Sequence, residues 1–194
     1  ADIESRMERL SQDLAALQGV EKGSLKLAIL TTVKYTVPKL LGGFCAAHPG
    51  IDVAMVVCNR ENLLLRLASN QDDLYIMGQP SENMDVVCED FADNPLVLVA
   101  PPSHPLVGRQ RLSPKRLKDE PFVLREPGSG TRLTTEKFFA GQGVRLKTRL
   151  EVGSNEAIKE SVEGQLGLSI VSLHALGPHH EGLAVLNVAG FPIR

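Results

Sequence analysis

Hydrophobic residues recur along the first twenty positions at alternating spacings of four and three. The residues of this stripe are Ile3, Met7, Leu10, Leu14 and Leu17. The spacing predicts a helix over 1–20 with the apolar seam of a short coiled coil. A single helix cannot cover its own seam, so two interpretations are open. The helix packs on its own domain, or it is an arm that pairs with another chain.

After this arm the pattern changes to that of a sheet covered by helices. Apolar and polar residues alternate over 25–29, a helical stripe follows over 33–44, and an apolar, β-branched run covers 51–58. Asn59 is placed to cap a further helix, and 74–77 forms another short strand. Strands that alternate with helices through short links predict a parallel sheet.

The second half of the chain repeats this arrangement. Two strands are expected first, over 84–91 and 96–100, and a proline-rich stretch follows them. The elements predicted beyond it are strands over 122–124, 146–152, 168–171 and 183–188 and helices over 130–141 and 154–163. The pattern therefore predicts two α/β lobes, joined near 92–105.

The composition excludes several classes of protein. The chain has 194 residues, a net charge of −2 and 4% aromatic residues. A free-standing nucleic-acid binder would carry a surplus of Lys and Arg, and a base-stacking platform would need more aromatic rings. No apolar run approaches the ~18 residues of a membrane span. We therefore expect a globular protein that neither crosses a membrane nor binds DNA through this segment.

The three cysteines bear on the compartment and on metal binding. Cys45, Cys58 and Cys88 are far apart, lie in apolar runs and form no CxxC pair or His/Cys cluster. We expect three buried, reduced thiols in a cytoplasmic protein, without a structural zinc site.

Polar residues follow the first predicted strand at Thr31, Thr32 and Lys34. Ligands of open parallel sheets bind beyond such strand ends. The two hydroxyls either cap the next helix or form an anion-binding corner with its free N–H groups. The Lys34 ammonium is either solvated or a ligand.

Two further helices begin with polar residues. The turn before the helix over 130–141 has the sequence Arg125-Glu126-Pro127-Gly128-Ser129-Gly130-Thr131-Arg132, in which backbone N–H groups can approach a phosphate or carboxylate. It lacks the Gly-Lys-Ser/Thr ending of a Walker A loop. Ser154 can cap the helix that follows, and Asn155 either supports that helix or reaches a ligand. The start of each of these two helices, like that of the helix after Thr31 and Thr32, carries partial positive charge, so the three together favour binding of a small anion.

The sequence gives little support to catalysis. No nucleophile has a base at a recognisable spacing, and the GxSxG pattern is absent from the sequence. We expect a binding protein that is not an enzyme and uses no cofactor or metal.

Four segments and the arm together resemble the effector-binding domain of LysR-type transcriptional regulators. The segments are Gly23-Ser24-Leu25-Lys26-Leu27-Ala28; Tyr35, Pro38, Leu40, Leu41, Phe44, His48 and Pro49; Arg125 to Arg132; and Ser154 to Lys159 with Val162, Gly164 and Gly167. The resemblance runs from end to end and matches the arm to the linker helix of that family. Leu30 to Tyr35 and Leu41 to Phe44 are most similar to the regulators of Calvin-cycle carbon-fixation operons.

The resemblance implies two Rossmann-like lobes of the periplasmic-binding-protein type II kind, preceded by the linker helix. The implied boundaries are 1–20 for the linker, 22–98 for the first lobe, and 99–194 for the second lobe with the start of a return to the first. The implied effector-binding residues are Thr31, Thr32, Lys34, Gly78, Gln79, Pro80, Ser129, Gly130, Thr131, Arg132 and Asn155.

The resemblance also implies a function. We expect the ligand-sensing part of a bacterial transcription factor, with a small anionic effector of the sugar phosphate, phosphoglycolate or NADPH class between the lobes. The lobes are expected to form a homodimer, and the full-length protein a tetramer. The winged helix-turn-helix of the family is absent from this sequence, so DNA binding is expected only through that missing domain, and related sequences continue past Arg194 into a strand and helix.

An extracytoplasmic solute-binding protein of a transporter is the alternative, because it has the same two-lobed fold. The arm and the unpaired cysteines favour the regulator.

Overall fold

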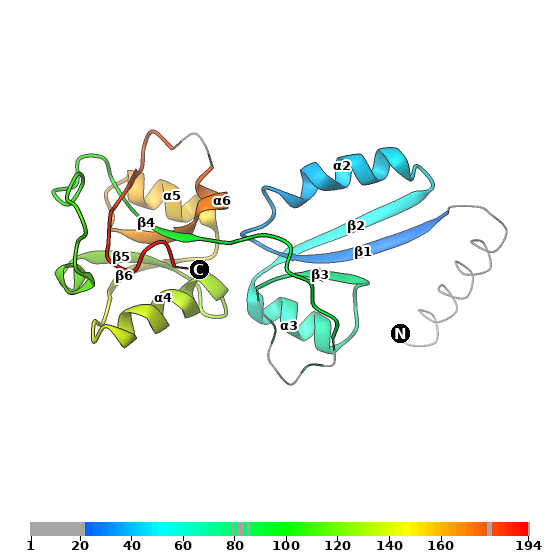
Figure 1. Ribbon diagram of the computed structural model, residues 1–194, viewed down its shortest axis with the longest axis horizontal. Coiled ribbons are helices and arrows are strands. Elements are labelled where there is room, and N and C mark those ends of the chain that lie inside the picture. The colour runs from blue at the N-terminus through cyan, green and yellow to red at the C-terminus, as the bar shows by residue number, and fades with distance from the viewer. Residues whose placement is uncertain (1–21, 79, 81–83, 85, 178–179, 194) are drawn as a thin grey trace.

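The computed structural model describes residues 22–78, 80, 84, 86–177 and 180–193 of the chain (Figure 1). These residues form two α/β lobes side by side along the longest axis, as the pattern predicts. The expected helix over 1–20, with Ile3, Met7, Leu10, Leu14 and Leu17, lies outside the described residues, and so does Gln79.

The first lobe is a parallel sheet with two helices, as expected. Its strands are β1 (Gly23–Leu30), β2 (Ile51–Cys58) and β3 (Leu74–Ile76), in the order β2-β1-β3, and its helices are α2 (Val37–Ala47) and α3 (Arg60–Ala68). Asn59 caps α3 as predicted, because its side chain accepts a 3.0 Å hydrogen bond from the Asn62 N–H. The central strand β1 buries Leu27 and Ile29, against which Val37 of α2 packs.

The second lobe contains the larger core. Its strands are β4 (Leu96–Ala100), β5 (Pro121–Arg125), β6 (Lys147–Val152), β7 (Ser169–Ser172) and β8 (Ala184–Val185). Its helices are the short 3-10 helix η1 (Pro114–Leu117), α4 (Gly130–Gly141), α5 (Asn155–Glu163) and α6 (Leu173–Leu176). β4 pairs antiparallel with β7 and β8, β5 pairs parallel with β6, and a bridge between Phe122 and Leu168 joins the two parts.

Both faces of the second sheet are covered. Leu96 and Leu98 of β4 enter one apolar cluster, and Val97 and Val99 enter another on the opposite face. Side chains of a strand alternate between faces, so a strand packed on both sides is apolar throughout. This explains why β4 is buried at every position.

The strand predicted over 84–91 is wrong. The described residues from Val86 to Phe91 form no strand, and Figure 1 shows them as part of the connection that crosses to β4. The apolar side chains of Val87 and Phe91 are exposed. A segment that passes between two sheets has no strand to pair with, whatever its sequence pattern. The predicted strand over 183–188 is shorter than expected, with only Ala184–Val185 in β8.

The chain also passes from the first lobe to the second at an earlier residue than the boundary between 98 and 99 that the resemblance implies. That boundary would cut β4, but the whole strand pairs within the second sheet. The crossover therefore ends before Leu96.

The expected burial of the cysteines is wrong for two of them. Cys45 and Cys88 are exposed, Cys58 is half-buried, and all three are free thiols. Cys45 lies on the outer side of α2, where Val37 is the only fully buried residue, and Cys88 lies in the crossover.

Candidate functional site

The strand ends of the two lobes meet at a polar junction. Arg125, the last residue of β5, donates hydrogen bonds from Nη1 to Thr31 Oγ1 at 3.2 Å and to Asn155 Oδ1 at 2.9 Å. The Asn155 Nδ2 group donates to the Thr31 carbonyl at 3.3 Å. Thr31 follows β1 and Asn155 begins α5, so two strand ends and one helix start come together between the lobes.

Arg125 is 2% exposed, and a neighbouring carboxylate makes its burial possible. Its Nε and Nη2 groups donate to the two oxygens of Glu126 at 2.7 and 2.9 Å. Asn59, the cap of α3, donates to Glu126 Oε1 at 3.3 Å from the other lobe. A buried charge needs such a bidentate partner, because its desolvation is otherwise uncompensated.

The two threonines after β1 do not cap α2. Thr36 occupies the N-cap position and its side chain makes no capping hydrogen bond. Thr31 instead accepts from Arg125, and Thr32 is 5% exposed with no hydrogen-bond partner for Oγ1. A buried hydroxyl without a partner is unusual, and it marks a place where a ligand group could bind.

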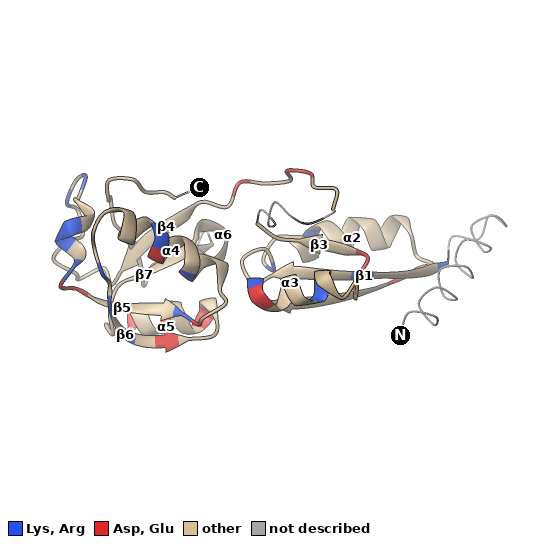
Figure 2. Cartoon of the chain, turned by 90° about the horizontal axis from the view of Figure 1, so that it is seen from below, with Lys and Arg blue, Asp and Glu red and all other residues tan. Residues whose placement is uncertain are grey.

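The start of α4 lies against the start of α3. Ser129 caps α4, and the Gly128 carbonyl accepts a 3.1 Å hydrogen bond from the Glu61 N–H of the first lobe. A Cβ added at Gly130 would lie 3.5 Å from the Arg60 Cδ atom, and one added at Gly78 would lie 4.0 Å from the Arg60 Nη1 atom. Figure 2 shows residues of both charge signs at the end of α3 that faces the second lobe.

A second polar contact across the lobes centres on Glu156 in the first turn of α5. Tyr35 donates to its Oε1 at 2.5 Å, and Lys34 donates to its Oε2 at 3.0 Å. Burial alone would raise the pKa of Glu156, but the hydrogen bonds from Tyr35 and Lys34 outweigh it and lower the pKa to about 2. Burial, and then the bond to Glu156, raise the pKa of Tyr35.

The remaining predicted residues lie in different surroundings. Thr131 is buried in the first turn of α4, and Pro80 is half-buried. Arg132 bonds to Glu136, Glu151 and the Arg125 carbonyl, all in its own lobe. This geometry does not support a direct effector contact for Arg132.

Sequence reasoning missed several residues of the junction. Arg125 and Glu126 belong to the glycine-rich segment, but the predicted effector-binding residues begin only at Ser129. Glu156 follows the selected Asn155, and Tyr35 follows the selected Lys34. The position of Arg125 at a strand end was an available signal for it. No local pattern indicated that Tyr35 and Glu156 would meet.

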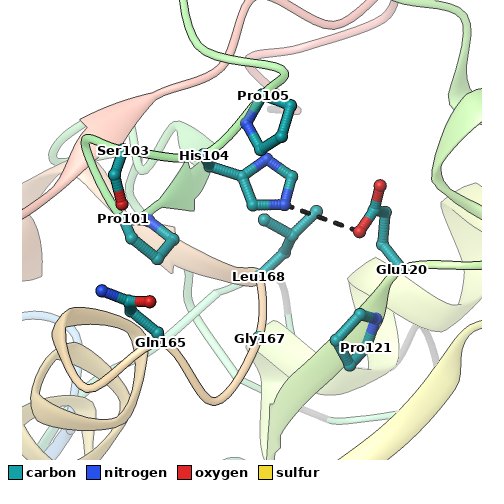
Figure 3. A pocket seen from close by; sticks show the side chains of 9 residues that line it. All are labelled: Pro101, Ser103, His104, Pro105, Glu120, Pro121, Gln165, Gly167 and Leu168. Carbon is teal, nitrogen blue, oxygen red and sulfur yellow. Dashed lines mark ion pairs between the residues drawn. The ribbon is translucent and has the colours of Figure 1, made fainter.

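A separate hollow of about 200 Å³ lies in the second lobe (Figure 3). Three proline rings and Leu168 form much of its wall, and His104 Nε2 faces Glu120 Oε2 at 3.5 Å. Pro121 lines it at the start of β5, whereas Arg125 ends that strand. The hollow is therefore at the other end of β5 from the junction.

The described part of the chain contains no group of three or more His, Cys, Asp or Glu side chains placed to hold a metal ion. Among the same residues, no helix combines the length and apolar character that a membrane crossing requires.

The junction has the chemistry of an anion site. The start of α5 offers partial positive charge and the unpartnered Thr32 hydroxyl offers a donor, beside the Arg125 guanidinium that Glu126 already pairs.

Comparison with known proteins relates the chain to transcriptional regulators. The sequence profile of the LysR substrate binding domain matches residues 18–194. The chain is 57% identical over 194 residues to a RuBisCO operon transcriptional regulator of Acidithiobacillus ferrooxidans, covering 99% of this chain and 63% of that protein. It is 46% identical over 199 residues to the transcriptional activator CmpR of Synechocystis, covering 100% of this chain and 64% of the activator. The chain thus spans less than two thirds of these relatives.

Solved structures share its fold. The regulatory domain of Synechocystis CcmR, in complex with 2-PG, is 44% identical with a TM-score of 0.85, covering 89% of this chain and 84% of that one. The effector-binding domain of QuiR, in complex with shikimate, is 22% identical with a TM-score of 0.75, covering 86% of this chain and 81% of that one. The expected two-lobed fold of the periplasmic-binding-protein type II kind is thereby confirmed.

Proposed function

The chain belongs to the LysR family as its substrate binding domain, and on this premise we propose that it senses a small phosphorylated metabolite for a regulator of carbon-fixation genes. The observation that carries the proposal is the convergence of Arg125, Asn155 and Thr31 at the ends of β5, α5 and β1. The similarity to carbon-fixation regulators supports the choice of target genes.

The effector binds at the junction between the lobes. Its anionic group accepts hydrogen bonds there from Thr31, Thr32, Asn155 and the start of α4. The unpartnered Thr32 hydroxyl supports this placement, since a bound oxyanion would give it an acceptor. Arg60 adds a positive charge beside Gly78 and Gly130, two of the residues implied by the family resemblance.

The preferred effector class is a small phosphorylated carboxylate such as 2-phosphoglycolate. The related CcmR domain was solved in complex with 2-PG, which supports this class above sugar phosphates and NADPH. A phosphate carries a charge near −2 at neutral pH and accepts several charge-assisted hydrogen bonds.

The domain acts by binding and not by catalysis. Effector binding changes the relative placement of the paired lobes of a cytoplasmic homo-oligomer, and residues 1–20 pass the change to DNA-binding domains beyond this chain. Effector control requires different affinities for the two arrangements. The relatives are transcriptional regulators, which supports this function over that of a transporter's solute-binding protein.

Calorimetry on the 194-residue chain tests the site. The ligands are 2-phosphoglycolate, a sugar bisphosphate, NADPH, inorganic phosphate and glycolate. We expect 2-phosphoglycolate to bind most tightly, and Thr32→Ala and Thr131→Ala to weaken it about tenfold each, as the loss of a hydrogen bond to a charged group does. Thr148→Ala, on an exposed part of β6, is the matched control and should bind as the wild type does. Tight binding that survives both site substitutions would overturn the placement of the effector.

A DNA-binding measurement tests the regulatory role. The full-length protein that contains this domain should change its affinity or its footprint on its own promoter when 2-phosphoglycolate is added. An effector that binds the domain without any change on DNA would contradict a regulatory role for binding.

A further inference from the structure

Glu156 places a carboxylate of the second lobe on donors of the first lobe. Its oxygens accept from the Tyr35 hydroxyl at 2.5 Å and from the Lys34 ammonium at 2.9 and 3.0 Å. Both donors lie in the turn after β1, a few residues from Thr31 and Thr32. The cation of this turn is therefore already paired with an anion that the protein itself supplies.

Glu156 can leave this position more easily than the other carboxylate of the junction. Glu126 is held by two hydrogen bonds from Arg125, whose side chain is 2% exposed and would be left buried without a partner. The side chain of Glu156 is 49% exposed and that of Lys34 is 29% exposed. If these two separate, water solvates both charges, so their separation costs little.

Glu156 also occupies the electrostatic position that an anion would take at the start of α5. A negative charge in the first turn of a helix is stabilised by the helix dipole, and it repels a second negative charge there. Asn155, which precedes Glu156, bonds to Arg125 at the centre of the junction. An effector held by Asn155 therefore approaches the Glu156 carboxylate.

We propose that Glu156 is an internal competitor of the anionic effector: its carboxylate holds Lys34 and Tyr35 when no effector is bound, and the effector takes these donors in its place. The inference rests on the proposed function, that the junction binds a small anion. It adds a selection rule for that anion. A phosphate, with its larger charge, displaces the carboxylate, whereas a monocarboxylate matches Glu156 in charge and gains little from the exchange.

Calorimetry with 2-phosphoglycolate on Glu156→Gln tests the competition, because glutamine has the same shape without the charge. We expect binding about 5- to 10-fold tighter than in the wild type, within the usual range of coupling between sites. Glycolate should also gain, by at most the same factor, because the substitution frees the same two donors for every anion and removes less repulsion for a singly charged one. The matched control is Glu160→Gln, which removes the same charge from an exposed position one turn along α5 and should change affinity less than twofold.

A double-variant comparison separates competition from a purely structural role. In a Lys34→Met background, Glu156→Gln should lose most of its effect on affinity, because the donor for which Glu156 competes is gone. A structural bridge between the lobes predicts the opposite sign, since its removal would weaken binding. Circular dichroism and a urea titration establish that each variant is folded.

The outcomes separate this inference from the function on which it rests. Wild-type binding with equal or weaker binding by Glu156→Gln would overturn the competition and leave the proposed effector site standing. Absence of anion binding in both the wild type and Glu156→Gln would overturn both. Binding that appears only in Glu156→Gln would support the competition in its strongest form.

Discussion

The Arg125 guanidinium, at the end of β5 in the second lobe, donates a 3.2 Å hydrogen bond to the Thr31 hydroxyl, at the end of β1 in the first lobe. The two residues are 94 positions apart in the sequence. Their contact brings together the carboxyl ends of two strands from different sheets, the region where open α/β sheets bind ligands. A ligand that binds to either residue therefore affects both lobes.

Removal of the Arg125 charge should destabilise the second lobe. In Arg125→Met the Glu126 carboxylate loses both of its bonds to the guanidinium. We expect the free energy of unfolding to fall by about 2–4 kcal/mol, near the cost of breaking a buried pair and reduced by the partial exposure of Glu126. Urea denaturation measures the loss, with Arg149→Met on exposed β6 as the control. Equal stability of the two variants would contradict the structural role of Arg125.

Thr32→Val should lower the affinity for the effector without lowering the stability of the fold. The variant keeps the shape of the side chain and removes a buried hydroxyl that has no partner. Without effector we expect a free energy of unfolding that is equal or higher by up to about 1 kcal/mol, because an unsatisfied polar group is no longer buried. Affinity for 2-phosphoglycolate should fall about tenfold. A variant that is clearly less stable would indicate a hydrogen bond of Thr32 within the protein.

Gly128→Ala should weaken the contact between α3 and the turn before α4. Gly128 has φ = +83°, and an added Cβ would lie 2.9 Å from the Glu61 Cβ atom of the first lobe. Gly108, with φ = +78° and nothing within 4 Å, is the matched control. Both substitutions incur the cost of a left-handed backbone, about 1–2 kcal/mol. Only Gly128→Ala also displaces Glu61.

Hydrogen exchange at the Glu61 amide measures this difference, because that N–H bonds to the Gly128 carbonyl. Exchange should be faster in Gly128→Ala than in Gly108→Ala. Equal exchange rates in the two variants would show that the hydrogen bond between Glu61 and Gly128 does not depend on the close approach of α3 to the turn before α4.

The Glu156 contact should give stability a specific dependence on pH. The pKa of Glu156 is lowered to about 2 in the folded chain, from an ordinary value of 4.5. A lowered pKa adds stability that is complete above about pH 5 and is lost as the pH falls through the folded value. Because the side chain is half exposed, we expect a contribution of only about 0.5–1 kcal/mol. Urea titrations from pH 7 to pH 3 should show a smaller decline for Glu156→Gln than for the wild type.

Glu160→Gln is again the control, and its decline should follow that of the wild type. Identical curves for all three proteins would contradict the lowered pKa of Glu156. No difference between wild type and Glu156→Gln in pH dependence is expected between pH 6 and pH 8 from this carboxylate, because Glu156 stays ionised there.

Deletion of residues 1–20 should reduce the assembly state of the chain. The seam of Ile3, Met7, Leu10, Leu14 and Leu17 cannot be covered by one helix alone, so we propose that it pairs with another copy. Light scattering should give fewer copies per particle for 21–194 than for the whole chain. An unchanged number of copies would remove the arm from the interface and favour its packing on its own domain.

Most secondary-structure elements could be predicted because their signals are local. The alternation over 25–29, the helical stripe over 33–44, and the Asn59 and Ser154 caps each depend on residues within a few positions. A strand is predicted over 84–91, around the apolar run Val86-Val87-Cys88, but the described residues of this segment form none. A strand also needs a partner edge, and no short stretch of sequence contains that information.

The candidate site was predicted in part for the same reason. Sequence placed polar residues at the ends of β1 and β5 and at the start of α5, and general rules of parallel sheets make those ends a ligand site. It did not indicate that Thr31 would accept from Arg125 rather than cap α2, or that Arg132 would bond within its own lobe.

By itself, then, the sequence determined the order of most elements, the two α/β lobes and the family resemblance, and it led to the expectation of an anionic ligand. These follow from periodicity, capping and motif order, which neighbouring residues encode. Only the tertiary structure decided which polar groups meet across the lobes, because Arg125 and Thr31, and Glu156 and Lys34, are about a hundred residues apart or more. Contacts at such separations depend on how the two lobes pack, and that packing fixes which donors an effector finds free and which it must take from Glu156.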